Sequence, residues 1–546
     1  MYLTAVLIAI TTWVFVIFYR KRRKYISLFK ELGIPGPTPS FILGNASQLQ
    51  PLGPANTLQM WTQKYGEFYG YYEGVTTPVL VTTDLDFLQH VFVKDFSIFA
   101  ARKSFPLNDE TSEENVNMFV AEGYRWKRLR SIVSPVFTTS KLKSMTPLMT
   151  GCVSTMMERM DAKHREDKPF NILEVFQGLT MEVISSTAFG IEVSQRNHDE
   201  PFLVACRRMF RNMEYKNMPF IFKALILTAA AFPEICCCLR WIFLSSFSPL
   251  RRLVIKDDTY LRDQFLALIA DRKENPINRP DFIQMMLTAE TESIDLTKEG
   301  ELYSEGVSTD EMKTNSYIMG VGSSSETFTK HLTLNEMEAN SRLFLIAGFE
   351  TTSNALGYAA YELAFRPDIQ EKMQEEMDEV LGAEGTLDYT SLQKLRYLDM
   401  VFNEILRLHP IAPSVITRRC LKDTLITGKL VKKGMVVAAD VLTIHNDPNI
   451  WGPDPDKFDP ERFDPELHSK RHPMSFLSFG VGPRNCIGMR FALLEGKLAL
   501  ATLINKYTVV KCADTPVPLR KTEGVTIAPT GGTIPVKLRL RDYKTK

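Results

Sequence analysis

The stretch FGVGPRNCIG at residues 479–488 constrains the fold of this 546-residue chain more than any other feature. It places one cysteine, Cys486, in a short loop that also holds three glycines and a proline. Gly480, Gly482 and Gly488 can adopt positive φ at little cost and let the backbone come close to a flat ligand, while the proline stiffens the turn. We therefore expect a tight loop that presents a single sulfur atom.

Two roles are open to Cys486. Backbone N–H groups of such a loop can point at the sulfur, stabilise a thiolate and tune the potential of a metal bound to it. A single axial thiolate is what a haem iron needs for O–O cleavage, so Cys486 is a candidate fifth ligand of a haem. The alternative is a small buried hydrophobic residue, which is the usual role of a lone cysteine.

The ten residues also match the haem-binding loop of the cytochromes P450, which reads Phe, Gly, any, Gly, any, Arg, any, Cys, any, Gly. The chain thus resembles a cytochrome P450. The resemblance implies a mainly α fold with small β-sheets (α+β) and a bound haem b whose iron has Cys486 as its axial ligand. It also implies that Phe479 stacks over the haem near the sulfur and that Arg484 binds a haem propionate.

Length and composition favour one large domain. The length alone would allow three or four domains at roughly 150 residues each, but no long Pro/Ser-rich linker divides the chain. We therefore expect one haem-binding catalytic domain over residues 41–546. The net charge of +1 argues against nucleic acid as a partner. The eight cysteines form no C-x-x-C pair, which indicates a reducing compartment, and the run at residues 236–238 is better explained by packing than by a metal or acylation site.

The N-terminus predicts a membrane anchor. Residues 2–19 carry no charge, and these eighteen residues just suffice to span a bilayer as a helix. The basic cluster RKRRK follows at residues 20–24, with no small-residue cleavage site after it, which argues against a secretory signal. The positive-inside rule keeps the cluster cytosolic. We predict a transmembrane helix over residues 1–24, a proline hinge over residues 25–40 like that of microsomal P450s, and a cytosolic domain at the endoplasmic reticulum.

Trp126 and Arg130 lie four residues apart on a predicted helix that starts near Glu122, and therefore on one helical face. An indole N–H and a guanidinium so placed can both bind a carboxylate, although a surface cation–π pair has the same spacing. The P450 resemblance implies that this pair binds a haem propionate. Lys127 and Arg128 point elsewhere and form either a basic surface for an acidic redox partner or ordinary solvated charges.

A long helix is expected around the segment LIAGFETT at residues 345–352. Small residues on one of its faces leave room for a flat cofactor and O2: Ala347, Gly348, Thr351 and Ala355. A threonine hydroxyl there can bond back to a preceding carbonyl and open a local kink. The adjacent acid and alcohol, Glu350 and Thr351, can relay protons from solvent. The alternative is close helix packing, but the segment matches the P450 oxygen-activation motif, which implies that Glu350 and Thr351 are catalytic.

Glu404 and Arg407 lie three residues apart and can pair on one face of a predicted helix. An exposed pair of this kind would contribute under about 1 kcal/mol. The segment FDPERF at residues 458–463 matches the P450 segment whose arginine, here Arg462, completes a buried Glu-Arg-Arg network behind the haem. By the same resemblance, Arg418 binds a haem propionate.

The sequence also predicts two hairpins and two further helices. Aromatic and β-branched residues at 68–72 and 78–82 predict a hairpin, followed by a helix that Asp84 caps. Residues 524–529 followed by residues 533–538 predict a second hairpin near the C-terminus, whose tip in P450s usually reaches the substrate. An amphipathic helix is predicted over residues 368–381, closed by a glycine.

Three segments are expected at the surface or near the substrate. The resemblance places residues 104–121 as a loop along the substrate pocket. The apolar residues 218–247 form either a buried core helix or segments that roof the pocket and dip into the bilayer surface. Residues 294–330 have low hydrophobicity and predict a mobile surface insertion with no assigned chemistry.

Taken together, the motifs predict a membrane-anchored haem-thiolate monooxygenase that resembles the microsomal family-three clan of P450s. It would insert one atom of O2 into a lipophilic steroid, fatty acid or xenobiotic. Its electrons would come from NADPH through a diflavin reductase, NADPH-cytochrome P450 reductase, with cytochrome b5 as a further partner. Two alternatives stay open: a P450-like isomerase that rearranges peroxides without a reductase, and a membrane-tethered helical protein without haem.

Overall fold

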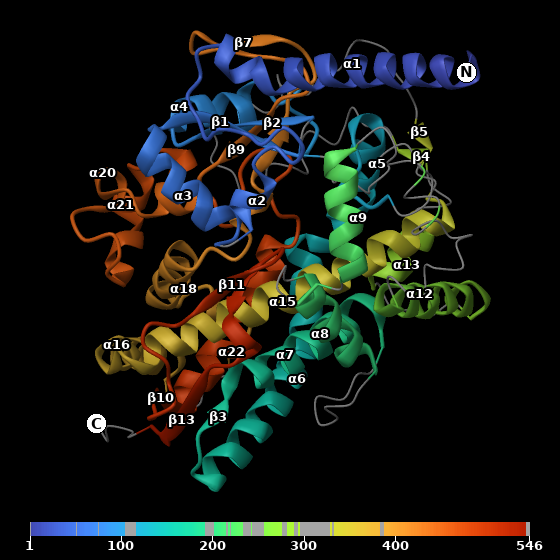
Figure 1. Cartoon of the computed structure of the whole chain (residues 1–546). Helices are drawn as coiled ribbons and strands as arrows, with labels where there is room; N and C mark the ends of the chain where they lie inside the picture. The colour runs from blue at the N-terminus through green and yellow to red at the C-terminus, as the bar shows by residue number, and fades with distance from the viewer. Residues whose placement is uncertain are drawn as a thin grey trace. The chain divides into compact units, whose positions relative to one another are not determined.

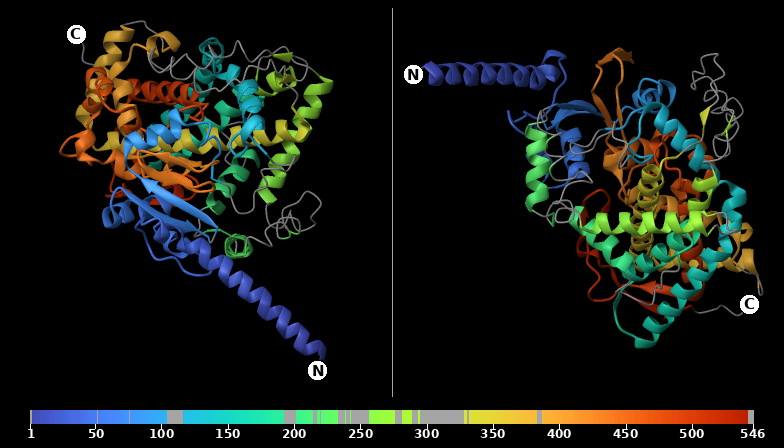
Figure 2. Two further views of the ribbon diagram at one scale, coloured as in Figure 1. Left: turned by 90° about the horizontal axis from the view of Figure 1, so that it is seen from above. Right: turned by 90° about the vertical axis from the view of Figure 1, so that its right-hand side faces the viewer.

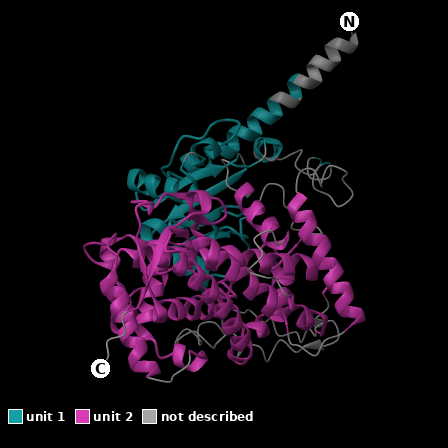
Figure 3. Cartoon of the chain, turned by 90° about the horizontal axis from the view of Figure 1, so that it is seen from below, with its two compact units in different colours: residues 1–108, 215–254, 414–444 teal, residues 109–214, 255–413, 445–546 magenta. Residues whose placement is uncertain are grey.

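A computed structural model describes residues 2–50, 52–74, 76–103, 116–191, 201–213, 217–218, 220–232, 238, 242, 256–275, 281–288, 293–294, 328–329, 332–382 and 387–541. The chain divides into two compact units (Figure 3). Unit 1 comprises residues 1–108, 215–254 and 414–444, and unit 2 comprises residues 109–214, 255–413 and 445–546.

Unit 1 is built on a four-stranded sheet with the strand order β1-β2-β9-β6. Figure 1 labels three of these strands, β1, β2 and β9. The strands are β1 (Phe68–Glu73), β2 (Thr77–Thr82), β9 (Val436–Ala439) and β6 (Thr417–Arg419). β1 and β2 form the hairpin predicted from the sequence, and β9 joins β2 in parallel. The side chains of Tyr69, Val79 and Val81 are fully buried on this sheet, and Trp61 of α3 (Pro54–Tyr65) packs on them.

The remaining elements of unit 1 are short, apart from its first helix. They are α1 (Tyr2–Glu31), α2 (Ala46–Leu49), α4 (Leu85–Gln89), the π-helical turn η1 (His90–Lys94), α9 (Phe220–Ala231) and the hairpin of β7 (Thr424–Ile426) with β8 (Lys429–Val431). Asp84 caps α4 as predicted, because its carboxylate accepts the N–H of Phe87 at 3.0 Å.

The predicted anchor helix with a basic stop at residue 24 is wrong in its end point. α1 continues through the basic cluster to Glu31 as one unbroken helix (Figure 2). Arg22 is buried, because its guanidinium lies over the ring of Phe18 and donates to the backbone carbonyl of Ala231 in α9. Among the residues that the structure describes, none of the helices combines the length and the apolar character needed to cross a membrane.

Unit 2 is mainly helical. Its larger helices are α5 (Gly123–Val133), α6 (Thr139–Glu166), α7 (Ile172–Ile184), α8 (Pro201–Met213), α12 (Lys256–Glu274), α13 (Phe282–Thr288), α15 (Leu334–Ala364), α16 (Pro367–Leu381), α18 (Arg396–Leu408) and α22 (Met489–Lys506). The small helices are α17 (Tyr389–Leu392), α19 (Val441–His445, which begins in unit 1), α20 (Pro448–Trp451) and α21 (Pro465–Ser469). α16 confirms the predicted amphipathic helix and ends at Gly382.

The long helix α15 organises unit 2 (Figure 1), and it packs against α7, α12, α18 and α22. Its start is fixed by a capping box, in which Thr333 and Glu336 each bond the other's backbone N–H. α15 approaches α7 so closely that a Cβ at Gly357 would meet Leu173 at 3.0 Å. The predicted long helix is therefore confirmed, and packing against α7 explains why glycine stands at this position.

The strands of unit 2 are short. β11 (Lys521–Glu523) pairs with β12 (Ile527–Pro529), β13 (Pro535–Leu540) pairs with β10 (Tyr507–Val510) and β3 (Phe170–Asn171), and β4 (Ser293–Ile294) pairs with β5 (Phe328–Thr329). The predicted pairing of residues 524–529 with residues 533–538 is therefore wrong. Gly531 and Gly532 both have positive φ and turn the chain away from β12. Residues 524–526 instead form the turn between β11 and β12.

Several predicted surface segments lie wholly or partly outside the described residues. They are residues 104–115 of the predicted pocket loop, residues 295–327 and 330 of the predicted insertion, Cys236 and Cys237, and most of residues 233–247.

Candidate functional site

The glycine-rich loop that carries Cys486 is tightly folded and belongs to unit 2. The N–H of Cys486 donates to the carbonyl of Phe479 at 2.8 Å, and the N–H of Asn485 donates to the carbonyl of Gly482 at 2.9 Å. Gly480 and Gly482 have φ of 67° and 78°, which side chains rarely allow. The loop is thereby closed on itself, and Cys486 is exposed at its end.

Gly488 differs from the prediction for the three glycines. Its φ is −86°, an ordinary value, and it is the residue that precedes helix α22. A Cβ at this position would meet Phe137 only at 3.9 Å, so neither strain nor contact requires glycine here.

His445 ties the segment just before this loop to helix α18, a role that the sequence did not reveal. The N–H of Leu477 donates to Nε2 of His445 at 2.9 Å, so the imidazole proton lies on Nδ1, which contacts the carbonyl of Arg407 at 3.1 Å. Burial lowers the pKa of His445 to about 3, so the ring is neutral at physiological pH, as this bonding requires. The hydroxyl of Ser478 also donates to the carbonyl of Leu406 at 2.9 Å.

Trp126, Arg130 and Arg484 lie together beside the Cys486 loop. The guanidinium of Arg130 donates to the backbone carbonyl of Asn485 at 3.0 Å and to its side-chain Oδ1 at 2.9 Å. The guanidinium of Arg484 lies 4.6 Å from the ring centre of Trp126 and donates to the carbonyl of Ala121. All three side chains are buried, so two cations stand beside the cysteine in a setting where a carboxylate would be bound strongly.

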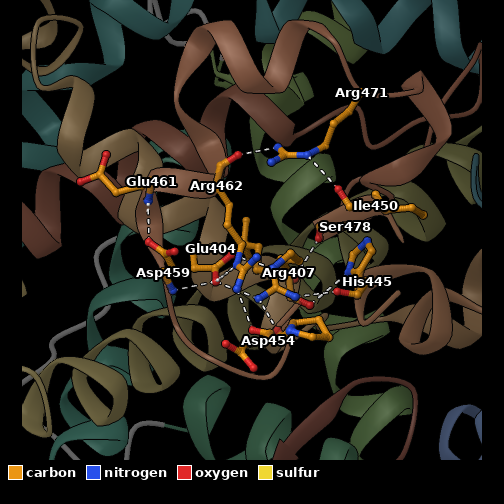
Figure 4. Close-up of polar contacts among 12 residues, drawn as sticks. Glu404, Arg407, His445, Ile450, Asp454, Asp459, Glu461, Arg462, Arg471 and Ser478 are labelled. Atoms are coloured by element: carbon orange, nitrogen blue, oxygen red, sulfur yellow. Dashed lines mark hydrogen bonds and ion pairs between the residues drawn. The ribbon is translucent and has the colours of Figure 1, made fainter. Parts of the chain in front are cut away.

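The predicted ion network around Glu404 is present in the structure (Figure 4). Arg407 binds the Glu404 carboxylate bidentately, at 2.6 Å from Nε and 2.8 Å from Nη2, and both side chains are fully buried. Arg462 lies 3.6 Å from the same carboxylate, and the N–H of Asp459 donates to it at 2.9 Å. Burial raises the pKa of Glu404, while Arg407 opposes that shift.

The outer nitrogens of both arginines bind backbone carbonyls. Nη1 of Arg407 donates to the carbonyl of His445 at 2.6 Å, and Nη2 donates to that of Pro455 at 2.7 Å. Nη2 of Arg462 donates to the carbonyl of Asp454 at 2.6 Å. The network therefore holds the segment from His445 to Arg462 against α18, and His445 also bonds Leu477, two residues before the Cys486 loop.

On α15, the candidate acid Glu350 and the candidate alcohol Thr351 form hydrogen bonds with different partners. The hydroxyl of Thr351 donates to the carbonyl of Ala347 at 2.6 Å, which confirms the predicted bond to the preceding turn. The carboxylate of Glu350 accepts a hydrogen bond from the hydroxyl of Thr526 at 2.6 Å. Of the residues of α15, all of which are described, only Leu334 at its start and Ala347 are exposed.

The small residues of α15 do not share one role. A Cβ at Gly348 would meet the side chain of Ile184 at 3.1 Å, so this glycine is explained by the close approach of α7. Ala347 is exposed in the middle of α15 and is therefore the small residue of this set that borders open space. α15 itself is one continuous helix over Leu334–Ala364.

Phe479 and Arg418 are the remaining predicted site residues. Phe479 is half-buried and its carbonyl accepts the N–H of Cys486. Arg418 lies on β6 of unit 1, where it is buried, donates to the carbonyl of Thr417 at 2.9 Å and lies 4.5 Å from the ring centre of Phe92.

Comparison with known proteins decides the family. The chain matches the cytochrome P450 family over residues 34–536, nearly its whole length. It belongs to the cytochrome P450 family. Members of this family are haem-containing monooxygenases, so the chain is a P450 monooxygenase by descent, and the mainly helical fold with small sheets agrees with that assignment.

Its relatives include vertebrate and nematode P450s. It is 33% identical to cytochrome P450 3A12 of Canis lupus familiaris over 500 residues, covering 90% of this chain and 88% of the relative. It is 34% identical to cytochrome P450 3A5 of Homo sapiens over 532 residues, covering 94% and 93%. It is also 34% identical to the putative cytochrome P450 cyp-13B1 of Caenorhabditis elegans over 524 residues, covering 94% and 95%.

The residues present in this P450 fit the haem that the family implies. A flat, dianionic cofactor needs one ligand for its iron, cations for its propionates and a surface without large side chains on its other face. Unit 2 supplies an exposed cysteine on a rigid loop, the buried cations Arg130 and Arg484 beside it, and an exposed alanine on α15.

Sequence reasoning missed three residues of the site: His445, Asn485 and Thr526. Asn485 adjoins Cys486, so its place in the motif could have drawn attention to it. His445 and Thr526 carry no motif, and each acts through a contact with a residue far away in the sequence.

Proposed function

We propose that this P450 inserts one oxygen atom from O2 into a lipophilic small molecule, such as a steroid, a fatty acid or a xenobiotic. The electrons come from NADPH and are delivered by NADPH-cytochrome P450 reductase, with cytochrome b5 as a further donor. The observation that carries this proposal is the exposed Cys486 on its closed loop, flanked by the buried Arg130 and Arg484. The proposal is supported by the likeness to vertebrate relatives that are named cytochromes P450 3A12 and 3A5.

In this proposal Cys486 ligates the haem iron, and the bound haem supplies the activation of O2. Trp126 and Arg130 hold one propionate, and Arg484 neutralises the charge of the propionates. Phe479 covers the haem near the sulfur. The backbone bonds of the loop keep the Cys486 sulfur in one position, which a metal ligand requires.

Glu350 and Thr351 handle protons in this proposal. Glu350 takes protons from solvent and passes them towards the site of O2 activation, and Thr351 borders that site with its hydroxyl bonded to Ala347. Glu404, Arg407 and Arg462 have a structural role: they hold the segment before the Cys486 loop and so permit haem incorporation.

We further propose that the N-terminal segment attaches the enzyme to the endoplasmic reticulum membrane, with the catalytic part in the cytosol. The support is the uncharged run of residues 2–19 and the exposed side chain of Trp13 on α1. For the reductase surface, Arg128 is a weaker candidate than the sequence indicated, because it pairs with the buried Glu336 at 2.5 Å, as does Arg125 at 2.8 Å.

The test is turnover of the purified haem protein with reductase, NADPH and isotopically labelled O2 against a panel of steroids, fatty acids and xenobiotics. The proposal expects a product that carries one labelled oxygen atom and forms only when the reductase and NADPH are both present. Rearrangement of an organic peroxide without reductase, with no labelled product from any panel member, would favour the isomerase instead.

A further inference from the structure

Thr526 makes a contact that the established P450 activity does not explain. Its hydroxyl donates to Oε2 of Glu350 at 2.6 Å, and the two residues are 176 positions apart in the sequence. Thr526 is 6% exposed and Glu350 is half-buried, so this bond is partly shielded from bulk water. A hydrogen bond from a hydroxyl to a carboxylate is short and strong in such a setting.

Three hydrogen bonds to backbone atoms of Thr526 and its neighbour Ile527 fix the position of Thr526 independently of its hydroxyl. The carbonyl of Thr526 accepts the N–H of Gly524 at 2.9 Å, which closes the turn between β11 and β12. The N–H of Ile527 donates to the carbonyl of Ile411 at 2.7 Å, and the hydroxyl of Tyr358 donates to the carbonyl of Ile527 at 2.9 Å. Because Tyr358 and Glu350 are both on α15, the β11–β12 hairpin is hydrogen-bonded to the helix that carries Glu350.

Glu350 is thereby oriented by the β11–β12 turn, while Thr351 is oriented by its own helix. The Thr351 hydroxyl is bonded to the carbonyl of Ala347 at 2.6 Å. A glutamate side chain has several rotatable bonds, and a carboxylate that moves protons works only within hydrogen-bond reach of its partners. A bond to one of its two oxygens restricts that motion.

We propose that Thr526 is a positioning residue for Glu350, whose carboxylate it holds in the orientation that delivers protons. This inference rests on the proposed function of Glu350. When proton delivery is misplaced, the two electrons and two protons that enter with O2 leave as hydrogen peroxide instead of forming water and oxygenated product. Loss of the Thr526 hydroxyl therefore shifts the products of O2 reduction and leaves the haem site intact.

The variants are Thr526→Val, which removes the hydroxyl at nearly constant volume, and Thr526→Ser, which keeps it. Thr522→Val is the matched control, because Thr522 lies in the same hairpin and its hydroxyl contacts that of Thr530 at 2.9 Å. Each variant is first checked for the reduced-CO spectrum and for thermal stability. Product and hydrogen peroxide formed per NADPH are then measured in H2O and in D2O.

For Thr526→Val we expect about tenfold less product per NADPH, more hydrogen peroxide and a larger solvent isotope effect. Thr526→Ser is expected within about twofold of the wild type, and Thr522→Val equal to it. A Thr526→Val enzyme with the wild-type product-to-peroxide ratio and isotope effect would overturn the proposal. So would equal defects in Thr526→Val and Thr526→Ser, because these would indicate a packing role.

Infrared spectroscopy separates failure of this inference from failure of the proposed function. The Glu350 carboxylate band is identified by subtracting the spectrum of Glu350→Gln from that of the wild type. We expect this band to shift in Thr526→Val and to stay in place in Thr522→Val. A band that does not shift would overturn the contact itself, even for a protein that shows no reductase-dependent turnover.

Discussion

Glu404 and Glu350 are two carboxylates of unit 2 with opposite surroundings. Glu404 is fully buried and is bound by Arg407 at 2.6 and 2.8 Å, by Arg462 at 3.6 Å and by the N–H of Asp459. Glu350 is half-buried and accepts a bond from the neutral hydroxyl of Thr526. Two guanidinium groups fix the Glu404 carboxylate in place, whereas the neutral hydroxyl of Thr526 orients the Glu350 carboxylate without adding a charge beside it.

The difference separates two kinds of site residue. His445 links the Glu404 network to the segment just before the Cys486 loop, because its carbonyl accepts from Arg407 and its Nε2 accepts from the N–H of Leu477. We therefore expect the Glu404 network to support folding of the haem site and Glu350 to affect turnover. Variants at the two glutamates should therefore fail in different ways, the first by loss of folded haem protein and the second by loss of turnover.

The largest effect is expected for Arg407→Ala. This change leaves the Glu404 charge buried without its bidentate partner, and we expect a loss of roughly 3–5 kcal/mol in the free energy of unfolding. Haem incorporation should be lost with it. The measurement is the yield of haem-loaded protein together with urea-induced unfolding of whatever folds.

Glu461→Gln is the control for this prediction. Glu461 pairs with Lys372 at 3.4 Å, and both side chains are 57% exposed, so its loss should change stability by under about 1 kcal/mol. Normal haem loading and unfolding in Arg407→Ala would contradict the distinction between the two glutamates.

The next effect is expected for Glu350→Gln, which keeps the size of the side chain and removes its ability to carry a proton. We expect product formation to fall by about 10²-fold, the lower end for general acid–base groups, with haem content and stability close to those of the wild type. Steady-state turnover beside the reduced-CO spectrum measures both quantities. Loss of haem in this variant would place Glu350 with Glu404 as a structural residue.

A third glutamate, Glu495 on α22, differs from both Glu404 and Glu350. It is buried, and its Oε1 has no hydrogen-bond partner among the described residues. Burial alone raises its pKa well above the ordinary value, so the folded state favours the neutral acid. The folded state then binds more protons than the unfolded state above the ordinary pKa, and stability falls as pH rises through that range. The slope is at most about 1.4 kcal/mol per pH unit.

Glu495→Gln removes this pH-dependent cost. We expect the variant to be more stable than the wild type at pH 8 and the advantage to shrink at pH 5, as measured by unfolding in urea at both values. The nearby thiol of Cys152, whose pKa burial raises to about 12, stays neutral over this range and does not contribute. An advantage that is equal at both pH values would show that Glu495 does not bind a proton on folding.

Local patterns in the sequence predicted much of the fold and the candidate site. The spacing of Trp126 and Arg130, and of Glu404 and Arg407, reflects one helical turn, so each pair lies on one face of α5 or α18. The turn glycines Gly480 and Gly482 were read correctly because positive φ is a local property.

Contacts between distant segments were not predictable in this way. The bond between Thr526 and Glu350 and the role of His445 depend on tertiary packing. The same limit explains the wrong partner for β12, since Gly531 and Gly532 could close a hairpin or turn the chain away. The sequence pattern predicts that Gly348 leaves room for the cofactor, but a Cβ at this position would meet the side chain of Ile184 at 3.1 Å.

The most direct measurement is the CO difference spectrum of the dithionite-reduced protein, with the wild type beside Cys486→His. Haem-thiolate ligation by Cys486 predicts a Soret maximum at about 450 nm in the wild type that is absent in the variant. A maximum at about 450 nm that persists in the variant, or a maximum at about 420 nm in both proteins, would contradict ligation by this sulfur. A purified protein with no haem absorbance at all would contradict the enzyme assignment as a whole.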